Sequence, residues 1–363
     1  MRNTLPFLYA DTDTFHGKAK MDKAQNQLVH TRFTELFGVR LPIVAGGLMW
    51  LANAEYVAAA AHSGILGFIT AASFSTLDEL RDEIQKCRDL SQGMPFGVNV
   101  SMLPHRVTGE QTEEVFELIA QEGIPYIETS GRSPEPYMPL IKEAGIKILH
   151  KVSTVRHAVS AQRQGVDAVS IVGAECGGHP GVEMVGTMVN TAWAARRLEI
   201  PYLVGGGFGC GSQITAALGM GASGVVIGTK FLTAHEIWAH DDYKRRLIEA
   251  QPTDTALCMH TVRNTVRVLH NDTVDDVQEI ERTKEDVTIE DLLPLVRGSF
   301  AREAYTSGDI RRGLLSAGQS LAFVEQQQPL AEIVQELEDG MRQAFDRLDQ
   351  LRQPVSQTAQ ASS

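Results

Sequence analysis

Short apolar runs alternate with longer amphipathic segments from about residue 41 to residue 230 of the 363-residue chain. Runs that are apolar on both faces are typical of parallel strands that are covered on both sides. Four of the runs are followed directly by glycine, and the segments between the runs have helical periodicity. The pattern predicts eight strands, at 41–45, 66–71, 96–100, 126–129, 147–152, 168–172, 201–204 and 224–227.

The segment after the second predicted strand shows the helical signals most clearly. Thr76 and Glu79 have the spacing of a capping box, and Leu80, Ile84 and Cys87 then recur on one helical face. Eight strands that alternate with helices predict an α/β fold of the (β/α)8 TIM-barrel type. A doubly wound open sheet is the alternative, but no G-x-G-x-x-G turn follows the first strand.

The strand–helix alternation ends near residue 236 and divides the chain. We expect a disordered extension at 1–27, a barrel at 28–236 and a smaller, mainly helical lobe at 237–352 that covers the barrel mouth. The end of this lobe, about 313–325, is expected to return to the barrel. Residues 353–363 are polar and are expected to be a disordered tail.

Composition limits the partners that the chain can have. It is 43% hydrophobic and carries a formal charge of −12, so it has no basic surplus for nucleic acid or for an anionic membrane. No apolar run is long enough to span a bilayer, and the N-terminus lacks the features of a signal peptide. Four widely spaced cysteines are typical of free thiols in a reducing compartment, so we expect a cytoplasmic protein.

The stretch after the sixth predicted strand carries the main candidate chemistry. His179 lies among glycines there, and it is the side chain of that stretch that exchanges protons near neutral pH. A tight turn with a solvated histidine is the simpler interpretation. A metal site formed by Glu175, Cys176 and His179 is disfavoured because no second histidine motif follows. Cys176 as a nucleophile has no feature that would lower its thiol pKa.

The ends of the other predicted strands carry residues that suit a bound cofactor. In barrel enzymes a phosphate commonly binds after strands seven and eight, and glycines follow both strands here. Lys151 at the end of strand five would place a cation near the N1–C2=O edge of a flavin. We therefore predict a cofactor site formed by Gly47, Leu48, Met49, Asn99, Ser101, Lys151, Gly178, Gly205, Gly206, Gly207, Gly228 and Thr229. The remaining histidines are predicted to be structural or solvated, and His150, beside Lys151, is the one of them that stays a further candidate.

These motifs together resemble the nitronate monooxygenase (2-nitropropane dioxygenase-like) family. The resemblance rests on ECGGHPG (175–181), GGG (205–207) and GTKFL (228–232), and it extends to TRFTELFG (31–38), PFGVN (95–99), HK (150–151), RNT (263–265) and SAGQ (316–319). It implies non-covalently bound FMN in the barrel, no metal, and a pocket between the mouth and the helical lobe. By position, His179 matches the active-site histidine, Gly47 to Met49 lie along the flavin ring, and Gly205 to Gly207 hold the phosphate with Gly228 and Thr229.

The resemblance is nearest to the branch that includes NADH:quinone reductases. Our leading hypothesis is oxidation of alkyl nitronates with O2, with His179 as the base or as the group that holds the anion. The alternative is an NAD(P)H-dependent quinone or enoyl reductase at the same FMN site. A non-catalytic flavin-binding module is the third interpretation. The sequence leaves a homodimer and the choice between NADH and NADPH open.

Overall fold

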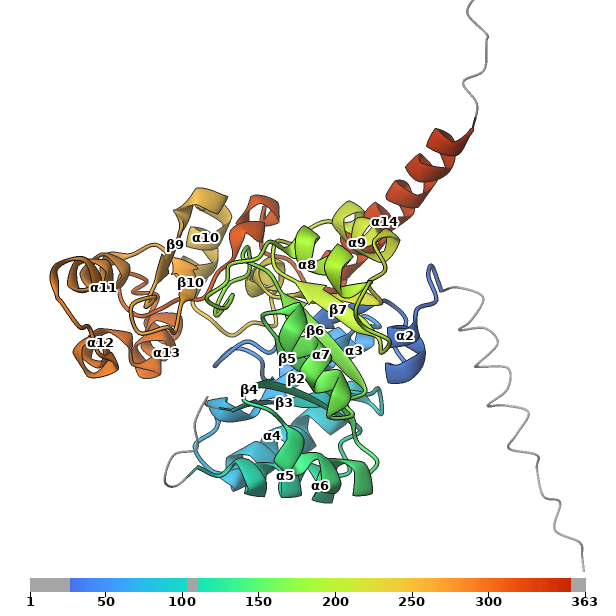
Figure 1. Ribbon diagram of the computed structural model, residues 1–363, viewed down its shortest axis with the longest axis horizontal. Coiled ribbons are helices and arrows are strands. Elements are labelled where there is room, and N and C mark those ends of the chain that lie inside the picture. The colour runs from blue at the N-terminus through green and yellow to red at the C-terminus, as the bar shows by residue number, and fades with distance from the viewer. Residues whose placement is uncertain (1–26, 103–109, 354–363) are drawn as a thin grey trace, which may run out of the picture.

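The computed structural model describes residues 27–102 and 110–353 (Figure 1). The expected extension and tail therefore lie outside the described residues, apart from Gln27 and Gln353, and so does His105. No helix in the described ranges has the length and apolar character that a membrane crossing requires.

Eight parallel strands close into a barrel in sequence order, which confirms the predicted (β/α)8 fold. They are β1 (Ile43–Ala45), β2 (Leu66–Thr70), β3 (Gly97–Met102), β4 (Tyr126–Gly131), β5 (Lys147–Val152), β6 (Ala168–Val172), β7 (Tyr202–Gly205) and β8 (Gly224–Ile227). Val44 of β1 pairs with Leu66 of β2 on one side and with Val226 of β8 on the other, and this closes the ring.

Helices join the strands and cover the outside of the barrel. They are α3 (Ala54–His62), α4 (Leu77–Ser91), α5 (Thr112–Gln121), α6 (Met138–Glu143), α7 (Val155–Arg163), α8 (Thr187–Ala194) and α9 (Gly211–Gly219), with short turns η1 (Ala71–Ser73), η2 (Glu135–Tyr137) and η3 (Thr229–Thr233). The Thr76 hydroxyl accepts a hydrogen bond from the backbone N–H of Glu79 and caps α4, as the sequence predicts.

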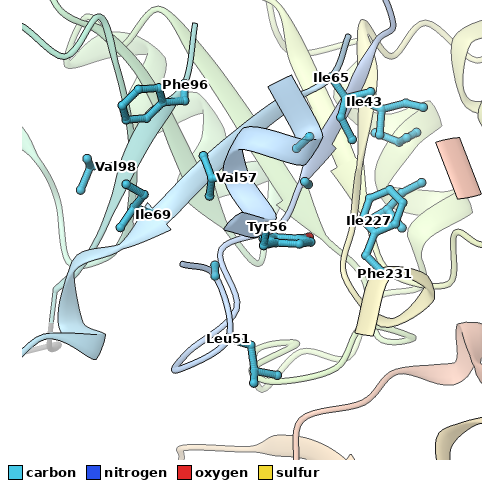
Figure 2. Close-up of a cluster of buried hydrophobic side chains, with 14 of the residues drawn as sticks. Ile43, Leu51, Tyr56, Val57, Ile65, Ile69, Phe96, Val98, Ile227 and Phe231 are labelled. Atoms are coloured by element: carbon cyan, nitrogen blue, oxygen red, sulfur yellow. The ribbon is translucent and has the colours of Figure 1, made fainter. Parts of the chain in front are cut away.

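The barrel has one apolar core outside its wall and another inside it. Figure 2 shows part of the outer core, in which side chains from β1, β2, β3 and β8 gather around Tyr56 and Val57 of α3. The inner core contains Leu149, Ala168 and Leu203, and Phe33 and Phe37 of α2 (Arg32–Phe37) belong to it. Because neighbouring residues of a strand point to opposite faces, these assignments fix which strand residues point into the barrel.

The chain after β8 forms helices and one small antiparallel sheet. The elements are α10 (Asp241–Glu249), η4 (Pro252–Asp254), β9 (Thr255–Cys258), β10 (Val266–Leu269), α11 (Asp272–Thr283), α12 (Ile289–Val296), α13 (Gly298–Ser307), η5 (Gln319–Phe323) and α14 (Leu330–Arg352). The sequence analysis did not predict β9 and β10, which have a separate core with α11 and α12. Helix α14 packs against α9 and α3 on the side of the barrel. It therefore takes the position of the eighth helix of a (β/α)8 barrel, although it is the last helix of the chain.

Candidate active site at the barrel mouth

A buried polar cluster lies inside the barrel near the carboxyl ends of β3 to β6. The Glu128 side chain has no solvent exposure, and its Oε2 accepts hydrogen bonds from Asn99 Nδ2 at 2.5 Å and from Lys151 Nζ at 3.1 Å. Ser101 Oγ donates to Asn99 Oδ1 at 3.2 Å. The cluster therefore combines three predicted residues with a carboxylate that holds two of them.

Two polar atoms of this region lack a hydrogen-bond partner in the part of the chain that the structure describes. They are Glu128 Oε1 and Ser170 Oγ, and both are buried. Ser170 is the cross-strand neighbour of Lys151 in the β5–β6 register. Buried polar groups are normally paired, so these two atoms are exceptions in the interior of the barrel.

The loop at 173–181 after β6 is held by contacts from four directions. Gly173 N donates to Gly205 O at 2.8 Å, and the Glu175 carboxylate accepts from the backbone N–H and the hydroxyl of Thr187. Arg267 of β10 donates through its guanidinium to Ala174 O and exchanges two backbone hydrogen bonds with Gly178, at 2.7 and 2.9 Å. The loop conformation therefore depends on residues far along the chain.

The segment 315–319 completes this support. Gln319 N donates to Glu175 O at 2.9 Å, and Gly318 N donates to the Thr229 hydroxyl at 2.9 Å. A Cβ atom at Gly318 would lie 2.6 Å from Glu175 O, so glycine is required for this close approach. The segment thus contacts both the loop after β6 and the start of η3.

The His179 imidazole on this loop is solvent-exposed, yet protein atoms crowd it. This crowding lowers the pKa of His179, and the positive charge of Lys151 lowers it further. The imidazole is therefore neutral at neutral pH and can accept a proton.

Cys176 and His150 have other roles. Burial raises the pKa of the Cys176 thiol to about 12, so it is not a thiolate nucleophile at neutral pH. His150 alternates with Lys151 on β5 and is buried, and its Nδ1 forms a 2.8 Å hydrogen bond with the Thr129 hydroxyl. Burial, with the charges of His157 and Lys151, lowers the pKa of His150 to about 4. It is a neutral structural histidine.

The predicted glycines lie where the backbone comes close to neighbouring segments. A Cβ atom at Gly47 would lie 3.0 Å from Asn99 Cγ. Gly206 and Gly207 have φ angles of +106° and +82°, which side-chain-bearing residues rarely adopt. A Cβ at Gly206 would also lie 2.9 Å from Thr187 Oγ1. Glycine is therefore required at positions 47 and 206 by the close packing of Asn99 against the end of β1 and of Thr187 against the end of β7.

The structure places the predicted residues at the carboxyl ends of the strands or in the loops that follow them. Leu48 is half-buried and Met49 is exposed after β1, and Gly228 and Thr229 begin the turn after β8. The sequence analysis missed Glu128, Ser170 and Arg267 as parts of this region. The inward alternation of β4 and β6 was the signal for the first two, whereas Arg267 had no local signal.

Comparison with known proteins identifies the family. The model of the nitronate monooxygenase family matches residues 30–340. A protein of Mycobacterium tuberculosis named (3aS,4S,5R,7aS)-5-hydroxy-7a-methyl-1-oxo-octahydro-1H-indene-4-carboxyl-CoA dehydrogenase is 31% identical over 257 residues, which cover 70% of each chain. A probable nitronate monooxygenase of Staphylococcus saprophyticus is 26% identical over 335 residues, with 81% of this chain and 93% of that protein covered.

A solved structure agrees with this relationship. FabK from Thermotoga maritima superposes with a TM-score of 0.80 at 27% identity, over 89% of this chain and 99% of that one. The fold, the matched family model and the relatives lead to the same conclusion. The chain belongs to the nitronate monooxygenase family of oxidoreductases.

Proposed function

We propose that the protein is an FMN-dependent enzyme that oxidises alkyl nitronates with O2. One observation carries the proposal: the His179 imidazole follows β6 and the Lys151 cation lies near the end of the neighbouring β5, and the surrounding protein, with the lysine charge, lowers the pKa of the histidine. A nitronate is a small anion, and its parent nitroalkane is a carbon acid. The pair therefore offers an electrostatic attraction for the anion and a base for the neutral acid.

The residues of the mouth fit FMN. A flat ring would lie along Gly47, Leu48 and Met49, where the glycine lets the backbone come close to Asn99. The donors Asn99, Ser101 and Lys151 suit the polar edge of that ring, and the buried Glu128 carboxylate holds Asn99 and Lys151 in place. Bound FMN supplies a redox centre that accepts electrons from one substrate and passes them to another.

The phosphate of FMN would bind between the ends of β7 and β8, as in other barrel enzymes. We place it at Gly205, Gly206, Gly207, Gly228 and Thr229, with Gly178 facing the same cofactor. The Thr229 hydroxyl accepts its hydrogen bond from Gly318 N, so its own hydrogen remains available to a phosphate oxygen. This arrangement links phosphate binding to the segment 315–319.

In the proposed reaction three residues have defined tasks. His179 removes the proton from the α-carbon of a neutral nitroalkane, or stays neutral beside a nitronate that is already ionised. Lys151 attracts the nitro oxygens and offsets negative charge at the ring edge. Glu128 keeps the Lys151 ammonium in place, because its Oε2 lies 3.1 Å from Nζ.

A second candidate is an NAD(P)H-dependent reductase, or a dehydrogenase of CoA thioesters, that uses the same site. The 31% identity to the mycobacterial CoA-thioester dehydrogenase favours it. In that case the nicotinamide and the quinone or enoyl substrate would use one pocket in turn. Lys151 and the cofactor-binding glycines would keep the roles given above.

The decisive experiment begins with the visible spectrum of the purified protein and the release and rebinding of FMN. O2 uptake with an alkyl nitronate is then compared with anaerobic oxidation of NADH and of NADPH in the presence of a benzoquinone. We expect the faster turnover with the nitronate. Turnover confined to the anaerobic assay would replace the proposal by the reductase, and a protein that does not bind FMN would refute both.

A further inference from the structure

The turn that follows β1 contains a residue in a strained backbone conformation. The N–H of Leu51 donates to the carbonyl of Leu48 at 3.0 Å, which defines a four-residue turn with Trp50 at its third position. Trp50 has a φ angle of +68°, in the left-handed region where this turn position favours glycine or asparagine. A bulky residue keeps such a conformation only where the surrounding contacts hold it.

Contacts from three segments hold Trp50. Its backbone N–H donates to Ser73 Oγ at 2.8 Å, and its backbone carbonyl accepts a hydrogen bond from Trp238 Nε1 at 2.8 Å. The guanidinium carbon of Arg302 lies 5.2 Å from the centre of the indole ring, which is the range of a cation–π contact. A Cβ atom at Gly298 would lie 3.8 Å from the indole nitrogen. Ser73 belongs to the barrel, whereas the other three partners belong to the chain after β8, two of them to α13.

The start of the same turn adjoins the predicted cofactor site. A Cβ atom at Gly47, immediately before the turn, would lie 3.0 Å from Asn99 Cγ, so the chain enters the turn against the buried polar cluster. A Cβ atom at Gly228 would lie 3.5 Å from Leu48 Cδ2, so the first side chain of the turn lies beside the end of β8. Asn99 and Gly228 both belong to the predicted site. The turn therefore begins between two predicted cofactor-binding segments, and its third residue is held by α13.

We propose that Trp50 is a positioning residue through which α13 fixes the turn 48–51 along the flavin ring. The contacts of the indole ring are with α13, so Trp50 acts through the backbone of the turn. A turn released from these contacts would adopt further conformations, and only some of them would accept the ring. The measured FMN affinity falls in proportion to the fraction of molecules whose turn is correctly placed. The inference rests on the FMN site of the proposed function, and it is independent of the substrate.

Fluorescence titration of the cofactor-free protein with FMN tests the proposal. Trp50→Gly supplies a residue that adopts a positive φ without strain, but it removes the ring that α13 holds. We expect it to raise the dissociation constant of FMN by about tenfold or more, whereas Trp50→Phe, which keeps an aromatic face for Arg302, should stay within about threefold of the wild type. A smaller loss in Trp50→Gly would overturn the proposal, as would equal losses in the two variants.

A substitution on α13 tests the other side of the contact. Arg302 is exposed, so Arg302→Leu should fold as the wild type does. Loss of an exposed cation–π contact should raise the dissociation constant of FMN by about two- to fivefold. In the Trp50→Gly background the same substitution should have no effect, because the ring is already absent. Equal effects in the two backgrounds, or no effect in either, would show that α13 does not act through Trp50.

The matched control is Gln92→Gly. Gln92 also has a positive φ, +52°, but it caps the end of α4 before β3 and therefore lies at the opposite end of the barrel from the mouth. Gln92→Gly should leave the dissociation constant of FMN and the visible spectrum of the bound flavin unchanged. At saturating FMN, Trp50→Gly should shift the flavin absorption bands, which a loss of stability elsewhere would not do. Unshifted bands would mean that the turn does not adjoin the ring, and the proposal would fail.

The titration also separates this proposal from the proposed function. A wild-type protein that does not bind FMN overturns both. A wild type that binds FMN but turns over only NAD(P)H with a benzoquinone overturns the nitronate reaction and leaves the role of Trp50 supported by the titration. A wild type whose FMN affinity and spectrum equal those of Trp50→Gly overturns the role of Trp50 alone.

Discussion

The pairing of Glu128 with Lys151 gives a quantitative test of the buried polar cluster. The Glu128 side chain has no exposure, whereas that of Lys151 is 23% exposed, and their charged atoms lie 3.1 Å apart. At this distance the gross attraction is about 5 kcal/mol for an effective dielectric constant of about 20. Desolvation of the two charges offsets much of this attraction. The pair as a whole therefore stabilises the fold by less than the stability that is lost when one partner is removed.

The two single substitutions should therefore differ in cost. Glu128→Gln should lower the free energy of unfolding by about 3 kcal/mol, the lower end of the range for a broken buried pair, because the Lys151 ammonium can move toward water. Lys151→Met should cost about 5 kcal/mol, because the carboxylate it leaves has no route to solvent. The double variant should lose less than the sum of the two, since it contains neither buried charge.

Urea unfolding of the cofactor-free proteins at pH 7 measures these differences without a contribution from ligand binding. The matched control is Asp78→Asn, which breaks the exposed ion pair between Asp78 and Arg81. It should change stability by less than about 1 kcal/mol. Two results would refute this account of the cluster. One is a double variant whose loss of stability equals the sum of the two single losses, and the other is a Lys151→Met variant that is no less stable than Glu128→Gln.

Four further predictions concern the mouth and its surroundings. His179→Asn should retain FMN but lower kcat by about 100- to 10,000-fold, measured by O2 uptake with a nitronate. Because the Lys151 cation lowers the pKa of His179, Lys151→Met should move the acid limb of the kcat/KM profile to higher pH. Burial keeps the folded pKa of His150 at about 4, below its unfolded value of about 6.5, so the stability it contributes is complete above pH 6.5 and is lost toward pH 4. The free energy of unfolding should therefore fall by about 3 kcal/mol less in His150→Asn than in the wild type when the pH is lowered from 7 to 4, as measured by urea unfolding. Gly206→Ala should weaken FMN binding at least tenfold by fluorescence titration, whereas Gly123→Ala, with φ +64° and no atom within 4 Å of the added Cβ, should not.

The barrel could be predicted from the sequence because its strands are short, apolar on both faces and separated by clear helix signals. The strand that carries Val44 and the helix capped by Thr76 both form as expected. The sheet of β9 and β10 could not be predicted in the same way. Each strand has four residues, and their pairing depends on a core with α11 and α12 that no local pattern shows.

The candidate site could be predicted in part, because strand ends of a barrel converge at one rim. Asn99, Ser101 and Lys151 were found from this rule alone. Glu128 was missed because its strand was treated as uniformly apolar. Ile127 belongs to the outer core, so the next residue, Glu128, has to point into the barrel. Sorting every strand residue by direction would have revealed the carboxylate as the partner of Lys151.

The position of His179 depends on the fold as a whole more than on its own loop. Arg267 holds the carbonyl of Ala174 and pairs with the backbone of Gly178, and it lies 93 residues beyond the first of these. Gly318 supports the loop from still further along the chain. The local glycines permit many conformations, and these distant contacts select one of them. A glycine-rich sequence around a histidine therefore identifies the loop, whereas the contacts from β10 and from 315–319 determine where the imidazole lies.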